Sequence, residues 1–256
     1  MFGFLFVDAL RDNLRFRRLW PWLLLAGFCF LVAFFWREWG FRPRPDRVYS
    51  LVSLTLVFKV LALASAIYST SVIGREVEQR TIVYLLTRPV PRWMIILSRF
   101  LASSIVVTLI GVLSVIGVSL AAYRGEAFAN EMLWRDMGAL AVGAFAYGAL
   151  FVLISLMVNR AMLVCLLYTF GWELLVPNLK GDAAALSVFN YLEAIANHPE
   201  VSQRRNLLTF LSGQLAGESV TPMGAFMTMA IAVAILAFAA CWWFSNFEYL
   251  PRDDAA

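Results

Sequence analysis

Long blocks of apolar residues constrain this chain more than any other feature of its sequence. Hydrophobic residues make up 61% of its 256 residues and charged residues only 15%, whereas a soluble domain averages about 45–50% and about 25%. The excess is gathered into blocks, and blocks of about 18 or more apolar residues are typical of membrane-spanning helices. The sequence therefore predicts an all-α integral membrane protein that lies in a lipid bilayer.

Six membrane spans are expected from these blocks. A single helix over 137–177 would be about 60 Å long, twice the hydrocarbon thickness, so the chain must turn at Asn159 and Arg160. The expected spans are about 20–36, 48–73, 93–122, 137–158, 161–177 and 223–244.

Two further segments lie outside these blocks. Residues 1–19 are amphipathic, with arginines at helical spacing, and predict a helix lying in the membrane interface. A signal peptide is the alternative, but no small-residue cleavage site follows the first apolar block. Residues 178–221 are too polar to span, and they are expected to form an outside segment that could bind a partner there.

The charge balance is basic, with 21 Lys and Arg against 17 Asp and Glu. Because the arginines are spread over short loops, they suit lipid head groups, and no nucleic-acid partner is expected. The face of the membrane that carries both termini would hold eleven basic residues, and the opposite face would hold nine. Because the cytoplasmic face normally has a clear excess of Lys and Arg, this small difference does not decide the orientation. The cysteines Cys29, Cys165 and Cys241 fall inside apolar blocks and predict small buried side chains, with no disulfide or metal site.

A polar stretch at 74–92, "GREVEQRTIVYLLTRPVPR", separates the second and third expected spans. Its residues from Glu76 to Leu86 favour a short helix, and the prolines that come after them redirect the chain stiffly into the next span. A push on such a helix would become a tilt of both spans. An ordinary amphipathic helix that covers lipid head groups is the alternative interpretation.

The longer stretch "GREVEQRTIVYLLTRPVPRWMIILSRF" (74–100) resembles the hallmark of type-2 ABC-transporter permeases. The resemblance implies a six-span fold with an N-terminal interfacial elbow helix and a cytoplasmic coupling helix at 74–88. It also implies a location in the cell (inner) membrane with both termini cytoplasmic. The positions that match the motif, and that would contact the ATPase, are Glu76, Glu78, Thr81, Leu85, Leu86, Pro89 and Arg92.

The family further implies an ATP-driven transporter, an exporter in this case. Two cytoplasmic ABC ATPase subunits and a second permease subunit, identical or related, would complete it. The chain has no G-x-x-x-x-G-K-[ST] loop, so ATP and Mg²⁺ would bind the partner ATPase, and this chain is expected to be neither an enzyme nor a cofactor binder. Two alternatives stay open: a subunit that passes mechanical work to an outside partner without bulk export, and an ATP-independent secondary transporter.

Two charged residues are expected within the spans, Lys59 and Glu173. A central Lys costs about 2.5–3.5 kcal/mol on insertion scales, so such residues usually face protein or water. In a functional interpretation, Glu173 and one face of the second span are part of the substrate path or of the seam between subunits. In the alternative interpretation, the two charges have a structural role, as an ion pair or as a lysine that snorkels to the interface. The residues on that face are Thr55, Lys59, Ala62, Ala66 and Ser69.

Counting along straight helices places Lys59 and Glu173 about 10 Å apart in depth, so a direct pair is not expected. His198, the single histidine, stands beside a proline in the polar segment and is expected to be an ordinary surface residue. Catalysis by these groups is not expected, because no paired carboxylates, histidine cluster or Ser–Lys arrangement accompanies them.

Overall fold

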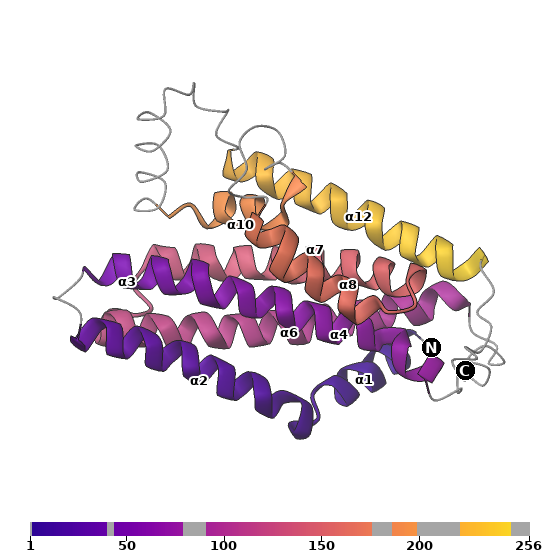
Figure 1. The fold of residues 1–256 in the computed structure, drawn as a ribbon, viewed down its shortest axis with the longest axis horizontal. Coiled ribbons are helices and arrows are strands. Elements are labelled where there is room, and N and C mark those ends of the chain that lie inside the picture. The colour runs from indigo at the N-terminus through magenta and orange to yellow at the C-terminus, as the bar shows by residue number, and fades with distance from the viewer. Residues whose placement is uncertain (1, 40–43, 79–90, 176–185, 199–220, 247–256) are drawn as a thin grey trace.

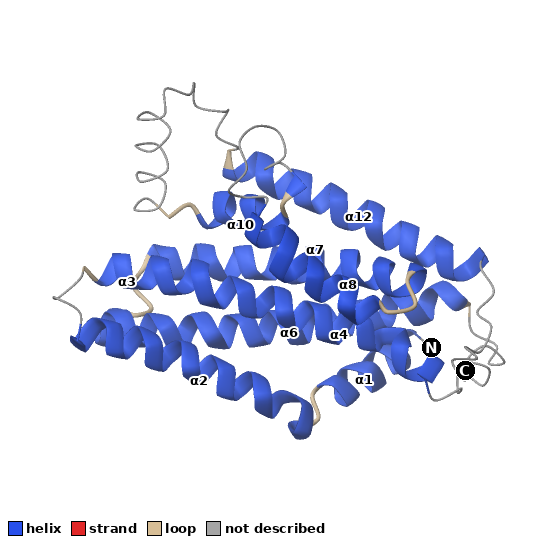
Figure 2. Ribbon diagram, viewed as in Figure 1, coloured by secondary structure: helices blue, strands red, loops and turns tan. Residues whose placement is uncertain are grey.

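The computed structural model describes five stretches of the chain, and all of them are helical. The described residues are 2–39, 44–78, 91–175, 186–198 and 221–246. No strand occurs within them, and Figure 2 shows helices joined by short loops. The prediction of an all-α protein is therefore confirmed for this part of the chain.

Most of the helical elements are α-helices, and Figure 1 labels the longer ones. Elements η1 and η3 are π-helical, with a wider turn than the α-helix, and η2 is a 3₁₀ turn. In chain order the elements are α1 (Phe2–Asn13), α2 (Phe16–Trp39), α3 (Pro45–Val52), η1 (Ser53–Val57), α4 (Phe58–Glu78), α6 (Arg92–Tyr123), η2 (Arg124–Glu126), α7 (Glu131–Met157), α8 (Ala161–Leu167), η3 (Tyr168–Trp172), α9 (Glu173–Leu175), α10 (Val188–Ala196) and α12 (Pro222–Asn246).

Local sequence explains where several of these helices begin. Pro45 opens α3, where a missing N–H costs nothing and the fixed φ suits the first helical turn. Pro91 is extended and precedes the first residue of α6. The side chain of Asn130 accepts a hydrogen bond from the Met132 N–H at 2.9 Å and so caps the start of α7.

Five helical stretches are long and apolar enough to cross a membrane. They are Phe16–Trp39, Pro45–Val72, Arg92–Glu126, Glu131–Met157 and Pro222–Asn246. The chain turns at Asn159 and Arg160, and the fifth span expected at 161–177 is represented by a shorter apolar helix, Ala161–Trp172. A multi-pass membrane protein is thus shown, whereas the count of six spans and the elbow and coupling helices are not confirmed.

The second of these stretches lies at the centre of the bundle. Elements α3, η1 and α4 continue one another from Pro45 to Glu78, and we call them the span-two rod. The rod packs against α6, α7 and α8, while α2 packs on α6 and α12 packs on α7 (Figure 1). In the span-two rod 67% of the most apolar window is buried, against 17% in α2 and in α12.

The two ends of the bundle differ in what they carry. We call the end where α4 ends and α6 begins the near end, and the end where α3 begins the far end. The short helix α1 lies at the near end beside α6, separated from α2 by a break at Leu14 and Arg15 (Figure 1). Helix α10 lies against α7 and α12, toward the far end.

Close contact between α6 and α7 depends on glycine. A Cβ added at Gly148 of α7 would lie 2.8 Å from the Ser104 Oγ and 3.2 Å from the Phe100 ring, both on α6. Contacts this short force side chains to shift, because Ser104 and Phe100 are themselves buried. Small residues allow helices in membranes to approach closely in this way.

We predict that Gly148→Ala lowers the free energy of unfolding by about 1–3 kcal/mol, because the added methyl group overfills the contact between α6 and α7. Thermal unfolding in detergent should show a lower Tm. Gly138→Ala is the matched control, since no heavy atom lies within 4 Å of a Cβ added there and alanine favours helix. An equal Tm for the two variants would contradict this account of the packing.

Candidate functional site

The polar stretch 74–92 is described only at its two ends. Glu76 and Glu78 lie in the last turn of α4, and Arg92 is the first residue of α6. Four other residues of the predicted coupling set lie outside the described residues: Thr81, Leu85, Leu86 and Pro89. The structure therefore shows the two helices that flank this stretch, α4 before it and α6 after it.

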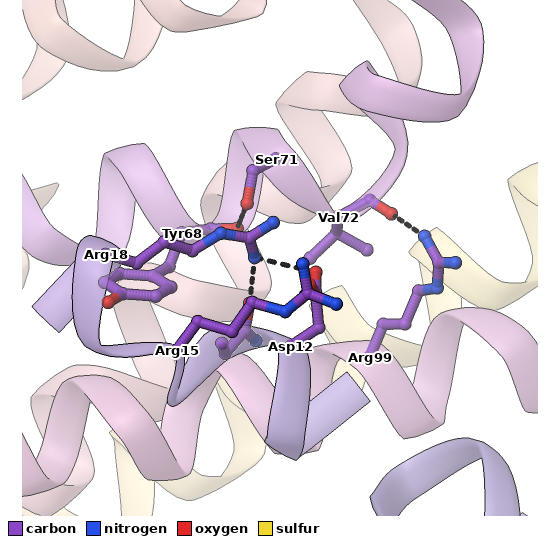
Figure 3. A network of polar contacts seen from close by, with 8 residues as sticks. Asp12, Arg15, Arg18, Tyr68, Ser71, Val72 and Arg99 are labelled. Carbon is purple, nitrogen blue, oxygen red and sulfur yellow. Dashed lines mark hydrogen bonds and ion pairs between the residues drawn. The ribbon is translucent and has the colours of Figure 1, made fainter. Parts of the chain in front are cut away.

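A side chain of α6 ties these two flanks together. Arg99 donates a hydrogen bond from Nη1 to the backbone carbonyl of Val72 at 2.6 Å, as Figure 3 shows. The contact joins residues 27 positions apart in sequence, one on each side of the polar stretch.

A second polar group gathers at the same end of the bundle. Arg18 of α2 lies 2.8 Å from the Asp12 carboxylate of α1 and donates to Asn13 at 3.2 Å, and Arg15 lies 3.3 Å from Asp12 (Figure 3). Ion pairs this exposed contribute little stability. They place Arg18 beside Tyr68 of α4, as Figure 3 shows.

Lys59 is half-buried in the middle of the span-two rod and has two partners. Its Nζ donates to the backbone carbonyl of Glu173 at 2.9 Å and lies 4.6 Å from the centre of the Phe189 ring. A cation–π contact of this kind is worth about 2 kcal/mol when it is removed from water. No ion pair between the Lys59 and Glu173 side chains occurs among the described residues. The two residues meet through the backbone carbonyl of Glu173, which the count of backbone depth had placed out of reach.

The Glu173 carboxylate is buried and accepts hydrogen bonds from several of the described residues. Its donors are the Tyr168 hydroxyl at 3.1 Å, the Ser187 hydroxyl at 2.6 Å and the backbone N–H groups of Val188 and Phe189 at 3.1 and 3.3 Å. The last two belong to the first turn of α10, so Glu173 caps that helix from a different part of the chain. The Glu173 side chain thus joins α10 to the fifth apolar helix, and its place on a substrate path or subunit seam stays a prediction.

The remaining predicted path residues do not share one open face in the described structure. Thr55 is exposed and Lys59 half-buried, but Ala62, Ala66 and Ser69 are buried in the bundle. The exposed stripe of the rod instead continues from Lys59 through residues such as Ile67.

A second buried carboxylate, Asp136 of α7, joins three parts of the chain. Its Oδ2 accepts hydrogen bonds from the Tyr49 hydroxyl at 2.8 Å and the Ser53 hydroxyl at 2.7 Å, both on the span-two rod. Its Oδ1 lies 2.9 Å from the Nε2 of His198, which lies just beyond the end of α10. Both side chains of the Asp136–His198 pair are fully buried.

The prediction of His198 as a surface residue is therefore wrong. Its neighbours in sequence are polar, but its partner, Asp136, is 62 residues away. Sequence reasoning missed Asp136 as well, although an acidic residue at the edge of an apolar block already signals a buried partner. Among the described partners of Asp136, the imidazole is the one that comes from the α10 segment.

The two carboxylate clusters have the same design. Ser53 is the first residue of η1 and donates to Asp136, and Tyr168 is the first residue of η3 and donates to Glu173. Each cluster places hydrogen-bond donors around a carboxylate and holds helices together. Such an arrangement positions helices, because the hydroxyl and backbone N–H groups around each carboxylate donate to that carboxylate.

The comparisons with known proteins place the chain in a family. A family model described as "ABC-2 family transporter protein" matches residues 14–176, well over half of the chain. The match includes the span-two rod, the polar stretch and both buried carboxylates. A comparison with curated proteins gave no match.

We predict that Asp136→Ala lowers the free energy of unfolding by about 2–4 kcal/mol, because the donors from Tyr49, Ser53 and His198 lose a buried acceptor. Thermal unfolding in detergent measures the loss. The matched control is Glu131→Ala on the same helix, whose exposed pair with Arg135 should be worth less than about 1 kcal/mol. If both variants unfold at the wild-type temperature, Asp136 does not hold the helices together.

Proposed function

This chain belongs to the ABC-2 family of transporter membrane proteins, and on that premise we propose that it is the permease subunit of an ATP-driven exporter. A separate cytoplasmic ATPase would drive it through residues 74–92. Two permease subunits and two ATPase subunits would form the complex in the inner membrane. ATP and Mg²⁺ would be bound by the ATPases, and both termini of the permease would lie in the cytoplasm.

One observation carries this proposal: the polar stretch is flanked by two long helices whose ends are tied to each other. The span-two rod leads into it, α6 leads out of it, and Arg99 bonds to the Val72 carbonyl across its base. Because the rod is also the most buried of the candidate spans, a push at its near end would be passed into the core.

The roles of the coupling residues are inferred from their places. Glu76 and Glu78, in the last turn of α4, would meet basic or polar groups of the ATPase, and Thr81, Leu85 and Leu86 would pack in its groove. Pro89 and Arg92 would fix the exit of the stretch into α6. In this scheme the ATPase moves the ends of two helices together.

The apolar faces of α2 and α12 are suited to a second permease subunit and to lipid. Both helices carry many exposed large hydrophobic side chains, among them Leu24, Phe28, Ile235 and Phe238. We propose that the helix from Ala161, extended through α9, serves as the fifth of six spans, with α1 as the elbow helix in the membrane interface.

A second candidate function is transmission of mechanical work to a partner outside the cell. Two contacts favour it: His198 beyond α10 meets Asp136 of α7, which also accepts from the rod, and Phe189 of α10 lies against Lys59 of the rod. A partner bound to the outside segment would then receive the movement of the rod. Deleting 199–220 tests this candidate: loss of a partner's activity with export intact would support it. An ATP-independent transporter is disfavoured, because Lys59 is held by Glu173 and Phe189 and is not poised to couple to an ion.

We predict that Glu76→Lys and Leu85→Asp each weaken association with the ATPase at least about tenfold, because charge reversal and a buried acid disrupt the docked surface. Co-purification of the ATPase with the tagged permease measures this, and membrane fractionation checks that both variants insert. Glu131→Lys, at the far end, is the control. Full ATPase recovery with both variants would refute the coupling role of this stretch.

The orientation is tested separately. A cysteine placed at Gln79, in a variant lacking the native cysteines, should resist an impermeant maleimide in intact cells and react after the membrane is opened. Labelling from outside intact cells would place residues 74–92 on the wrong face of the membrane and overturn the proposed function.

A further inference from the structure

Lys59 belongs to the exposed stripe of the span-two rod and lies about half-way along it. Thr55 precedes it by about one turn, and Leu63 and Ile67 follow on the same face at intervals of four residues. Thr55 and Ile67 are exposed, while Lys59 and Leu63 are half-buried. The stripe is therefore a largely apolar surface around a positive charge.

The hydroxyl groups on this stripe bond back to their own helix. The Thr55 hydroxyl donates to the Leu51 carbonyl at 2.5 Å, and the Thr70 hydroxyl donates to the Ala66 carbonyl at 2.7 Å. A hydroxyl has a single hydrogen to donate, so neither group has a donor left for a bound molecule. Lys59 differs from them because an ammonium has three N–H donors.

The Lys59 ammonium is held in place and still has a donor to spare. Its Nζ donates to the Glu173 carbonyl at 2.9 Å and lies 4.6 Å from the centre of the Phe189 ring. That ring is fixed in turn against Phe58, with the two ring centres 6.2 Å apart. Among the described residues no second hydrogen-bond acceptor meets Nζ, so at least one N–H points to neither partner.

The Glu173 carboxylate does not supply the missing partner. It accepts hydrogen bonds from the Tyr168 and Ser187 hydroxyls and from the first turn of α10, and it makes no ion pair with Lys59 within the described part of the chain. A backbone carbonyl and a ring face carry no net charge, so they orient the ammonium without neutralising it. An anion bound at Lys59 would supply both the charge and the acceptor.

The depth of Lys59 distinguishes such an anion from a resident lipid. Lys59 lies near the middle of the stretch Pro45–Val72, about 20 Å from either end at 1.5 Å per residue. The hydrocarbon core of a bilayer is about 30 Å thick, so resident head groups lie about 15 Å from its middle. Because Nζ is bonded to the Glu173 carbonyl, the side chain does not extend toward them. A head group at this depth belongs to a molecule that is crossing the membrane.

We propose that Lys59 binds the anionic head group of the exported molecule, and that this molecule is an amphiphile whose hydrocarbon part lies along Leu63 and Ile67. A phosphate, sulfate or carboxylate has the required charge and acceptor oxygens. A neutral amphiphile lacks the charge, and a cationic one is repelled. This inference rests on the proposed function, because it names the class of substrate for the proposed exporter.

The test compares two photoreactive probes on the complete permease–ATPase complex in phosphatidylcholine nanodiscs. One is dodecyl phosphate with a diazirine beside the phosphate, and the other is dodecanol with the diazirine on the same carbon. Mass spectrometry measures labelling of residues 55–67 relative to that of α12, whose exposed surface reports how much probe is in the bilayer. We expect the phosphate probe to label 55–67 at least about fivefold more than the dodecanol probe.

Competition identifies the part of the probe that is recognised. Unlabelled dodecyl phosphate should abolish the difference between the probes. Inorganic phosphate and dodecanol at the same concentration should not, because each lacks either the chain or the charge. Full competition by inorganic phosphate would show a site for a free anion and would overturn the amphiphile.

Variants of Lys59 separate charge from structure. Lys59→Gln can still donate to the Glu173 carbonyl but has no charge, and it should lower phosphate-probe labelling at least about fivefold, to the level of the dodecanol probe. Lys59→Arg keeps the charge and should retain at least about half of the labelling. Arg135→Gln, which removes an exposed charge at the far end, is the matched control and should change nothing. Thermal unfolding in detergent checks that each variant is folded.

Equal labelling of 55–67 by both probes in the wild type, or undiminished labelling in folded Lys59→Gln, would overturn the binding site. Should Lys59→Gln fail to fold, the two probes on the wild type and Lys59→Arg decide. Labelling at Lys59 without ATP-dependent transfer of dodecyl phosphate in proteoliposomes would overturn its assignment to a substrate. Retention of the ATPase by Glu76→Lys and Leu85→Asp would instead overturn the proposed function, whatever binds at Lys59.

Discussion

A carboxylate removed from water must be surrounded by hydrogen-bond donors, and two such groups organise this protein. Asp136 and Glu173 are both fully buried, and their donors come from elements far apart in the sequence. Asp136 joins α7, the span-two rod and the segment after α10. Glu173 joins the fifth apolar helix to the start of α10. Removal of either carboxylate would leave several donors unsatisfied at once, which makes each cluster cooperative.

The π-helical turns are part of the same arrangement. Each of them begins with a residue that donates to one of the carboxylates, Ser53 in η1 and Tyr168 in η3. A π-helical turn adds a residue to the helix and rotates the residues beyond it, so it brings a chosen side chain to a partner that a regular helix would miss. The same rotation separates Thr55 from the buried positions Ala66 and Ser69.

Much of the fold could be predicted because hydrophobicity and length are local properties. The apolar blocks indicated the helical class, and helix length required the turn at Asn159 and Arg160. The family was predicted from the motif at 74–100 and is shown by the match over 14–176.

The buried pairs could not be predicted in this way. Asp136 and His198 are 62 residues apart, and Lys59 meets Glu173 across 114 residues. Depth counting missed the second contact because it compared backbone positions and left out the length of the lysine side chain, which reaches the Glu173 carbonyl. His198 looked like a surface residue because its sequence neighbours are polar, whereas its burial is decided by a tertiary partner.

The uneven burial of the helices has a consequence for how the sequence can vary. In α2 and α12 only 17% of the apolar window is covered by the rest of the chain, while the span-two rod is mostly enclosed. A side chain that meets fluid lipid tails needs only to be apolar, whereas one inside the bundle must also have the right shape. Positions of the peripheral helices that meet lipid can therefore exchange leucine, phenylalanine and isoleucine more freely than positions inside the bundle or against a second subunit, where the shape of the side chain also counts.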